Sequence, residues 1–475
     1  MVFSSLYFIF VFFPLVCLVY YLFKLIFPSK IQIRNCFLLL ASLFFYAWGE
    51  PVYVFIMMFS IIVNYFCSLL FNKIPKSKVI LIICIVFNLS FLFFFKYSAF
   101  ALSNINVIFK TKFTVPDFSL PIGISFYTFQ ALSYIIDVYR KKVEPQKNIL
   151  NLALYISLFP QLIAGPIVRY IDIQNEIVNR KETLENFTAG LIKFMTGLGA
   201  KVIIANNLAV FADGILNQGR DAFSLIPGGV VWLSCISYAF QIYFDFFGYS
   251  LMAIGLGKMF GFSFPDNFNS PYCAASVTDF WRRWHITLSS WFRDYVYIPL
   301  GGNRCKPLRH IINLLVTWTL TGFWHGASWN FIIWGFYYAV LLIFEKYIIS
   351  KIKMNSLVKN SLYRFITLFI ILFGWIIFRS ENLLQIGMIL KGMFYGSQGN
   401  ISFINYISEH ADVCSKMIFI IPALLCSFPL NKVSVFKNKN TRSQIIQIIF
   451  ALIIFIVSVF MLVASTYNPF IYFKF

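Results

Sequence analysis

The amino-acid sequence predicts an all-α polytopic membrane protein. Of its 475 residues, 60% are hydrophobic and 20% aromatic, whereas only 12% are charged, which is about half the charged fraction of a soluble domain. Several apolar runs approach the length of about 20 residues with which a helix crosses a bilayer. The runs are continuous rather than alternating, which excludes a transmembrane β-barrel along with soluble, secreted disulfide-rich and disordered classes. We expect about eleven or more helices.

The net charge of +21 and the nine cysteines fit the same class. In a membrane protein, Lys and Arg gather in loops that face the cytoplasm, so the charge does not indicate a nucleic-acid partner. The cysteines form no CxxC pair and mostly lie in apolar runs, where a thiol acts as a small hydrophobic group. We expect neither disulfides nor a metal site. Residues 1–475 are predicted to form a single membrane domain.

The first helix is predicted to be retained. Its start lacks the basic region of a signal peptide, and its apolar run, which ends at Phe27, is too long for one. With the N terminus outside the cytoplasm, the first helix crosses the membrane into the cytoplasm, and Cys36–Phe71 crosses outward and back. Val79–Phe100 then crosses outward, and Pro121–Tyr139 crosses back to the cytoplasm. The basic loops then face the cytoplasm; they are Pro28–Asn35, Asn72–Lys78, Arg140–Asn148, Lys346–Lys359 and Leu430–Ser443.

The late helices are expected to alternate in the same way. Gly396–Asp412 is polar yet contains no Lys or Arg, so we place it outside the cytoplasm. Arg364–Phe378 then exits, Cys414–Pro429 returns and Gln444–Ala464 exits, which puts the C terminus outside as well. Arg169–Glu185 mixes charges with isoleucines and is predicted to be an interfacial helix.

Residues 258–346 depart from simple spanning and form the predicted catalytic core. Ile311–Trp324 would make about 21 Å of helix and Trp329–Phe344 about 24 Å, and both are shorter than the roughly 30 Å hydrocarbon core. We therefore predict a re-entrant hairpin over Ile311–Lys346. Non-helical backbone at such a tip is tolerated only where it lines a cavity or tunnel within the protein.

His325 lies at the tip of this hairpin, between Gly322 and Gly326. An ionisable residue inside a membrane is costly and indicates function by default, and the small neighbours would let an acyl group approach the imidazole. A neutral imidazole there can take a proton from an attacking hydroxyl as a general base. The alternative is a core histidine bonded to a backbone carbonyl.

His285 is the second candidate. If residues 279–295 form a helix, His285 shares an apolar face with Trp281 and Leu288. The alternative role is a structural histidine that holds two helices together. His310 and His410 fall in predicted loops and are expected to be solvated.

Other chemistry-bearing patterns are weak. The sequence contains no GxSxG, HExxH or GxxxxGK[ST] motif. Asp137 and Asp245 are interpreted as structural acids that pair with an Arg or cap a helix. The turn at Leu300-Gly301-Gly302, near Arg304, is a weak candidate for a phosphate contact.

Two histidine-containing blocks are similar to a known family. Phe323-Trp-His-Gly-Ala-Ser-Trp329 and Asp279–Gly302 resemble the membrane-bound O-acyltransferase superfamily, in the branch of the alginate and peptidoglycan O-acetyltransferase membrane subunits. The resemblance covers essentially the whole chain. Further agreement comes from Met1–Ser5, Pro121–Gln130, Phe159–Ile167, Tyr243–Ser250 and Phe470–Phe475.

This resemblance implies a ring of helices around a central tunnel, with re-entrant helices. In such enzymes an acyl group passes from a cytoplasmic thioester to an extracytoplasmic hydroxyl. The resemblance implies that His325 is catalytic and His285 important, and that an extracytoplasmic serine-esterase-type partner places the acetyl group on a polysaccharide. Acetyl-CoA is the expected donor, and its phosphates are expected near basic residues that also fit the ordinary cytoplasmic charge bias; these are Arg282, Arg283, Arg293, Arg304 and Lys306.

The C-terminal tail carries one further candidate, Tyr472. Pro469 blocks continuation of the last helix, and a six-residue extended tail reaches about 20 Å, far enough to fold back into the outer mouth of the tunnel. The resemblance raises the interpretation that Tyr472 accepts the acyl group and relays it to the partner. The alternative is an interfacial aromatic anchor.

The sequence therefore predicts an O-acetyltransferase of a bacterial cell membrane, acting on a cell-envelope or exported polysaccharide. D-alanyl transfer to teichoic acid is the alternative among enzymes. A transporter or flippase for a polysaccharide precursor is the alternative from another class. Paired discontinuous helices in two related halves would favour a transporter, and the sequence shows one hairpin and no internal repeat, which favours the enzyme.

Overall fold

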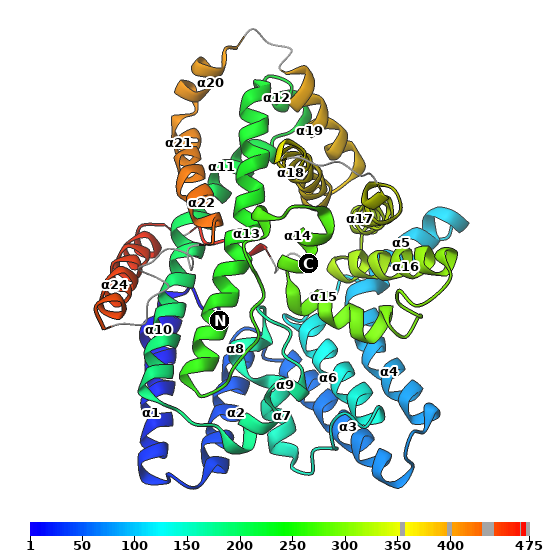
Figure 1. The fold of residues 1–475 in the computed structure, drawn as a ribbon, viewed down its shortest axis with the longest axis vertical. Coiled ribbons are helices and arrows are strands. Elements are labelled where there is room, and N and C mark those ends of the chain that lie inside the picture. The colour runs from blue at the N-terminus through cyan, green and yellow to red at the C-terminus, as the bar shows by residue number, and fades with distance from the viewer. Residues whose placement is uncertain (352–356, 397–400, 430–440, 466, 472–475) are drawn as a thin grey trace. The chain divides into compact units, whose positions relative to one another are not determined.

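The computed structural model describes residues 1–351, 357–396, 401–429, 441–465 and 467–471. Every regular element within these ranges is a helix (Figure 1), so the predicted all-α class is confirmed. Eight helices in the described ranges are long and apolar enough to cross a membrane. They are Phe8–Ile26, Tyr53–Lys73, Lys78–Phe109, Leu184–Leu216, Gly228–Met259, Trp329–Lys351, Ser361–Arg379 and Arg442–Ala464.

The helices form two compact units. Unit 1 contains Met1–Phe194 and Tyr249–Asp266, and unit 2 contains Met195–Gly248 and Asn267–Phe475. Of the three boundaries, one falls inside α10 (Leu184–Gly199), one inside α13 (Gly228–Met259) and one between Asp266 and Asn267, so α10 and α13 each contribute residues to both units.

Unit 1 is built around α6 (Ile124–Tyr139), a helix that is buried along almost its whole length. Helices α3 and α4 pack against it, as do α7 and α9. Ser77 caps α4, because its side chain accepts a hydrogen bond from the backbone of Ile80. Apart from α6, the α-helices that lie wholly in unit 1 are α1 (Phe13–Ile26), α2 (Ile31–Ala47), α3 (Tyr53–Lys73), α4 (Lys78–Leu92), α5 (Ser98–Phe109), α7 (Ile149–Ser157), α8 (Phe159–Leu162) and α9 (Tyr170–Asn179).

The predicted interfacial segment Arg169–Glu185 contains the helix α9 (Tyr170–Asn179), and its position at a membrane surface stays a prediction. Helix α9 buries Ile173 and Ile177. Just beyond it, Arg180 donates to Tyr20 Oη at 2.9 Å, and Tyr20 Oη donates to Glu182 Oε1 at 2.5 Å. Arg180 and Glu182 therefore belong to a buried network inside unit 1, where each has a partner that offsets its desolvation, whereas Asp172, Lys181 and Glu185 are exposed.

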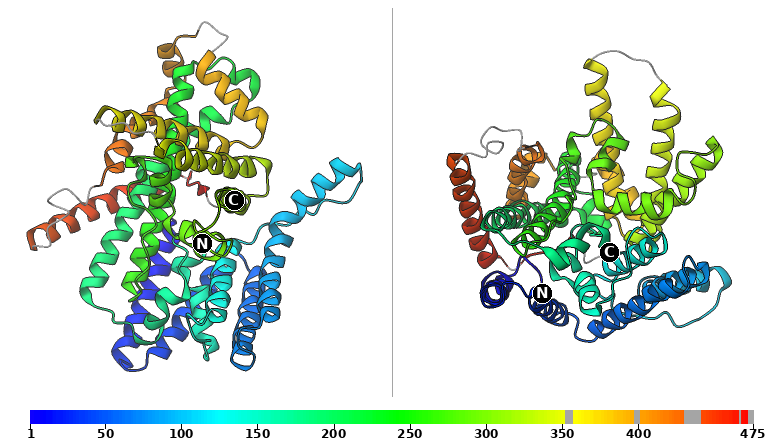
Figure 2. Two further views of the ribbon diagram at one scale, coloured as in Figure 1. Left: turned by 45° about the vertical axis from the view of Figure 1, so that its right-hand side comes forward. Right: turned by 60° about the horizontal axis from the view of Figure 1, so that its bottom comes forward.

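Unit 2 contains the end of α10, which continues into η3 (Ala200–Ala205) and α11 (Asn206–Leu216), and the part of α13 up to Gly248. Figure 2 shows its helices from two further sides. The later helices are α14 (Val277–Arg283), α15 (Ile286–Phe292), α16 (Pro307–His325), α17 (Trp329–Tyr347), α18 (Leu357–Arg379), α19 (Leu383–Tyr395), α20 (Phe403–Glu409), α21 (Ala411–Cys414), α22 (Ile420–Ser427) and α24 (Thr441–Ala464).

A cluster of buried aromatic rings holds α14, α17 and α18 together. The rings of Trp281 and Tyr338 lie 4.7 Å apart, and those of Trp284 and Trp375 lie 4.6 Å apart. All four side chains are almost fully buried, and rings at these distances contribute beyond the area they bury. The cluster fixes α14 against the hairpin that carries His325.

The predicted hairpin is present, and its helices are longer than predicted. Helix α16 begins at Pro307 and ends at His325, and α17 continues into a 23-residue segment that is long enough to cross a membrane. The expected 16-residue second helix is therefore wrong in length. Gly322 and Gly335 allow the two helices to touch, because a methyl group at Gly322 would overlap the carbonyl oxygen of Phe331, and one at Gly335 that of Trp318. The re-entrant path stays a prediction.

One predicted late span follows a sharp bend. Most of Cys414–Pro429 falls within the helical segment Ala411–Ser427, which is joined to α20 through a bend of 98° that precedes Cys414. Its path across the membrane stays a prediction. The predicted exits at Arg364–Phe378 and Gln444–Ala464 fall inside α18 and α24, which both contain segments long enough to cross.

Candidate functional site

His325 is the last residue of α16 and is almost fully buried. The helix stops there because Gly326 is extended, and a side chain at Gly326 would overlap the ring of Phe331. Three aromatic rings surround the imidazole, with centroids 4.9 Å away for Trp324 and 5.2 Å away for both Trp334 and Phe378. The ring environment sets the orientation of His325.

His285 lies between two short helices and not on one helix, so the predicted shared face with Leu288 is wrong. It occupies the left-handed region with φ 42° and begins α15. A non-glycine residue there is uncommon. The kink turns the imidazole toward Asn267 and Phe246, whose ring centroid lies 4.6 Å from that of His285.

A hydrogen bond to Asn267 determines the tautomer of His285. Nδ1 of His285 lies 3.0 Å from Oδ1 of Asn267, and the same oxygen accepts from the hydroxyl of Thr287 at 2.9 Å. Since this oxygen is an acceptor, Nδ1 donates, and Nε2 carries the lone pair of the neutral ring. Burial lowers the pKa of His285 well below its usual range, and nearby His325 lowers it further. His285 is therefore neutral at pH 7.

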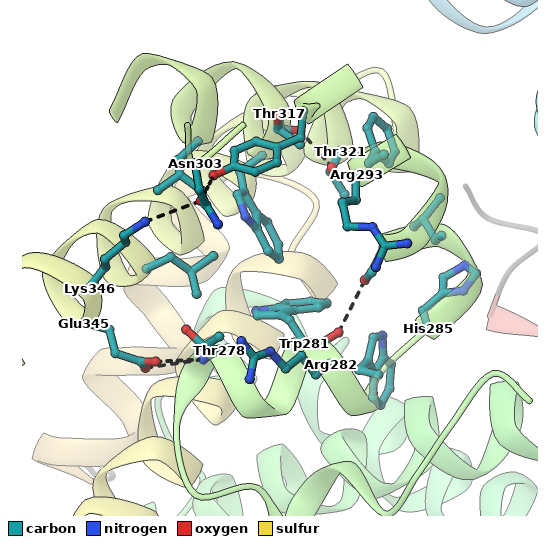
Figure 3. A pocket seen from close by; sticks show the side chains of 18 of the residues that line it. Thr278, Trp281, Arg282, His285, Arg293, Asn303, Thr317, Thr321, Glu345 and Lys346 are labelled. Atoms are coloured by element: carbon teal, nitrogen blue, oxygen red, sulfur yellow. Dashed lines mark hydrogen bonds between the residues drawn. The ribbon is translucent and has the colours of Figure 1, made fainter. Parts of the chain in front are cut away.

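Both histidines line one cavity of about 660 Å³ in unit 2. In Figure 3, His285 lies at one end of the cavity, and Glu345 and Lys346 lie at the other. Aromatic side chains, among them Trp281, line much of the wall between them. The volume is in the range of pockets that bind small molecules.

Of the five residues predicted to bind the donor, two line the cavity and three do not. Arg282 and Arg293 line it. Arg283 does not, and its Nε instead lies 2.9 Å from Oδ1 of Asp279. Arg304 and Lys306 are also absent from the lining. Two of the five predicted basic residues are thus placed beside the histidines.

His310 was expected to be solvated, and this prediction is wrong. It is buried in α16 and lines the cavity. Lys346 Nζ lies 3.0 Å from its Nε2, and Tyr347 Oη lies 2.9 Å from its Nδ1. Oδ1 of Asn303 also lies 3.0 Å from Nε2, and since this oxygen accepts whereas the Lys346 ammonium donates, the two contacts do not fix one tautomer of His310. Burial lowers the pKa of His310, and Lys346 lowers it further.

Glu345 is a second lining residue that the sequence did not indicate. Its carboxylate accepts from the backbone N–H of Val277 at 2.9 Å and from that of Thr278 at 3.3 Å. Tyr363 donates its hydroxyl to the same group at 3.0 Å. Glu345 thereby ties α17 and α18 to the first turn of α14, where a negative charge is stabilised by the unpaired N–H groups.

Comparison with known proteins decides the family. The family model described as MBOAT, membrane-bound O-acyltransferase family, matches residues 145–388. This range is more than half of the chain and contains every residue that lines the cavity. The chain belongs to the membrane-bound O-acyltransferase family. It is therefore a multi-pass membrane protein and an O-acyltransferase.

The relatives of this O-acyltransferase include polysaccharide-modifying enzymes. It is 36% identical over 500 residues to "Probable alginate O-acetylase AlgI" of Pseudomonas putida, with all of both chains covered. It is 34% identical over 522 residues to "Peptidoglycan O-acetyltransferase" of Helicobacter pylori, covering 100% of this chain and 98% of the relative. "Teichoic acid D-alanyltransferase" of Bacillus subtilis is 30% identical over 240 residues, covering 48% and 60%.

Other predicted residues of the O-acyltransferase lie away from the cavity. His410 was expected to be solvated, but it stacks on Tyr406 with ring centroids 4.2 Å apart and its Nδ1 lies 3.1 Å from the Tyr406 carbonyl oxygen. Asp137 lies 3.8 Å from Lys142 Nζ in unit 1. The glycine turn has positive φ at Gly301 and Gly302, as a tight turn requires.

The predicted relay residue, Tyr472, lies outside the described residues. The tail before it is described from Tyr467 to Ile471, and Phe470 and Ile471 are buried. Asp245, predicted to be structural, contacts this tail: its Oδ2 accepts from the backbone N–H of Ile471 at 2.8 Å. Its charged partner is Lys201 and not an arginine, at 2.6 Å.

Proposed function

We propose that this O-acyltransferase moves an acetyl group from cytoplasmic acetyl-CoA across the bacterial inner membrane for O-acetylation of an extracytoplasmic polysaccharide. The polysaccharide would be alginate-like or peptidoglycan, as the names of the full-length relatives suggest. The observation that carries the proposal is one cavity that His325 and His285 both line, with His285 at one end and Lys346 at the other.

His325 is proposed as the general base. It would take the proton of the attacking hydroxyl as the oxygen bonds to the thioester carbonyl carbon, and the thiolate would leave as the carbonyl re-forms. The enclosing rings of Trp324, Trp334 and Phe378 support this role, because they exclude water that would otherwise hydrolyse the thioester. Base catalysis of this kind contributes on the order of 10² to 10⁴ in rate.

His285 is proposed to position the reacting groups and stabilise the developing charge. Its Nδ1–H is held by Asn267, so the ring keeps a fixed orientation. Its lowered pKa keeps it neutral, which avoids a second positive charge beside His325 when that residue takes the proton.

The phosphates of acetyl-CoA are proposed to bind to basic residues that line the cavity. Arg282 and Arg293 line it, and Lys346 lies at the end away from His285. These cations would attract the anionic donor, and a guanidinium can bind phosphate in a bidentate manner. The predicted roles of Arg283, Arg304 and Lys306 are proposed only as contributions to the positive field, since none of them lines the cavity.

The acceptor step is proposed to use Tyr472 and an extracytoplasmic serine-esterase-type partner. The phenol of Tyr472 would take the acetyl group with His325 as base, and a phenyl ester is a better acyl donor than an alkyl ester. The partner's nucleophile would then receive the acetyl group and pass it to the polysaccharide. With this routing, the N and C termini lie outside the cytoplasm.

The direct test supplies purified protein with radiolabelled acetyl-CoA, the partner and either alginate or peptidoglycan. Label in one of the polymers is the expected result, and intact-mass analysis of the protein alone should show an increase of ~42 Da on the tail, as an acetyl intermediate requires. Tyr472→Phe should lose this adduct and the transfer. Normal polymer acetylation by Tyr472→Phe would remove Tyr472 from the route.

D-alanyl transfer is the second candidate, because the teichoic acid D-alanyltransferase of Bacillus subtilis matches about half of the chain. The two functions use different donors. A D-alanyl carrier-protein thioester offered in competition with acetyl-CoA should leave the acetyl transfer unchanged, whereas transfer of D-alanine with no transfer of acetyl would favour the second candidate.

A further inference from the structure

The C-terminal segment Tyr467–Ile471 contacts unit 2 and buries its last two residues there. Figure 2 shows this segment in red beyond the end of α24. Only 8% of Phe470 and 7% of Ile471 is exposed. Backbone groups at the buried end of a segment need partners within the protein, so the contacts that satisfy them decide whether the segment stays in place.

Two buried charges each hold one backbone group of this segment. Lys201 Nζ donates to the carbonyl oxygen of Pro469, and Asp245 Oδ2 accepts from the N–H of Ile471 at 2.8 Å. The two charges also pair with each other at 2.6 Å, and each side chain is only 2% exposed. The ion pair and the tail therefore form one bonded group.

The start of the segment is held as well. Tyr467 donates its hydroxyl to Oδ2 of Asp213 at 2.6 Å, and Oδ1 of Asp213 lies 2.8 Å from Arg379. Asn206 donates its side-chain amide to Oδ1 of Asn468 at 3.0 Å. Polar contacts thus run along the segment from its first described residue to its last.

The cost of burying charge indicates that the pair has a task other than stability. Desolvation of two ions offsets most of their attraction, and a well-packed apolar pair of similar volume is often as stable or more stable. Lys201 and Asp245 are therefore poor choices for holding η3 and α13 together. They are well suited to binding a segment that presents one free carbonyl and one free N–H group.

The residues that hold the tail are chain neighbours of rings that pack against the two histidines. Phe246, next to Asp245, has its ring centroid 4.6 Å from that of His285. Phe378, next to Arg379, has its ring centroid 5.2 Å from that of His325. Seating of the tail is in this way linked to both histidines through single residues of α13 and α18.

We infer that the Lys201–Asp245 ion pair is a latch that seats the C-terminal segment inside unit 2, and that acyl transfer requires the seated segment. Lys201 and Asp245 are positioning residues in this scheme. The seating itself is independent of the reaction, whereas its requirement for transfer rests on the proposed function.

The test measures seating and transfer separately. In a background whose native cysteines are replaced, Ile471→Cys reports on the tail through its rate of reaction with N-ethylmaleimide in detergent. The added Lys201→Met or Asp245→Asn substitution should raise this rate about tenfold or more, as release of a protected segment does, and should abolish transfer. Lys193→Met is the matched control, because Lys193 lies earlier on the same helical run and pairs with the exposed Asp266.

A double variant distinguishes positioning from structural support. Lys201→Met with Asp245→Leu should recover the thermal midpoint that either single variant loses, because an apolar pair replaces the ion pair, yet it should leave the tail reactive and transfer low. A protected Ile471→Cys thiol in either single variant, or normal transfer by a variant with a reactive tail, would overturn the latch. If the parental protein transfers no acetyl group, the proposed function fails while the labelling result still decides the seating.

Discussion

At the scale of single residues, His325 is the position on which the chemistry depends. His325→Ala should leave the fold intact, because the enclosing rings of Trp334 and Phe378 remain packed in unit 2. It should lower acetyl transfer by roughly 10² to 10⁴, the usual contribution of a general base. The measurement is turnover of acetyl-CoA by purified protein. His410→Ala is the matched control, since His410 does not line the cavity. Parental turnover by His325→Ala would refute the assignment.

His285 gives a prediction about pH. Burial lowers its pKa in the folded protein, whereas the unfolded chain has a value of about 6.5. Below that value the unfolded state binds more protons, so the stability contributed by neutral His285 is present above pH 6.5 and is lost as the pH falls. The loss approaches about 1.4 kcal/mol per pH unit for one proton.

The check compares thermal midpoints in detergent at neutral and mildly acidic pH. The parental protein should lose more stability on acidification than His285→Gln, which cannot take up the proton. Equal losses in the two proteins would show that His285 does not contribute to the pH dependence.

The sequence identified part of the cavity at this scale. Four of its lining residues were predicted to be site residues: His325, His285, Arg282 and Arg293. The cost of placing an ionisable side chain inside a membrane and the local sequence motifs indicated them. His310 and Glu345 were missed. Their roles depend on the side-by-side packing of α16 and α17, and this register cannot be deduced from residue type.

At the scale of elements, contact between α16 and α17 depends on their glycines. Gly322→Ala should destabilise the protein by about 1–3 kcal/mol, as overpacking does, because its methyl group would overlap the Phe331 carbonyl. It should also lower transfer, since His325 lies on the next turn. Gly387→Ala in α19 is the matched control, as nothing lies within 4 Å of its added carbon. Thermal unfolding measures the stability of both variants. An unchanged thermal midpoint for Gly322→Ala would contradict the packing of α16 against α17.

Helix boundaries show where sequence reasoning was less accurate. The apolar run at Ile311 marked the predicted start of α16, but the helix begins at Pro307, since proline is favoured at a first helical position. His285 was placed on a continuous helix because residues 279–295 alternate apolar and polar groups with helical spacing. The left-handed φ at His285 is set by tertiary contacts with Asn267, which the local pattern does not contain.

At the scale of the whole molecule, composition was sufficient for the fold class. Apolar content and run length predicted an all-α membrane protein, and the helices of both units confirm the class. The division into two compact units had no signal in the sequence, because two of its three boundaries fall inside the unbroken helices α10 and α13. The resemblance of two histidine blocks predicted the family, which the match over residues 145–388 confirms.

The central claim is transfer of an acetyl group across the membrane through the cavity that contains His325. The most direct test uses membrane vesicles that contain the protein, its partner and the polysaccharide, prepared with either face outward, and supplies radiolabelled acetyl-CoA outside. Labelled polysaccharide should form inside vesicles whose cytoplasmic face is outward, and none should form with His325→Ala. Labelling only in vesicles of the opposite orientation, or equal labelling with His325→Ala, would contradict the account.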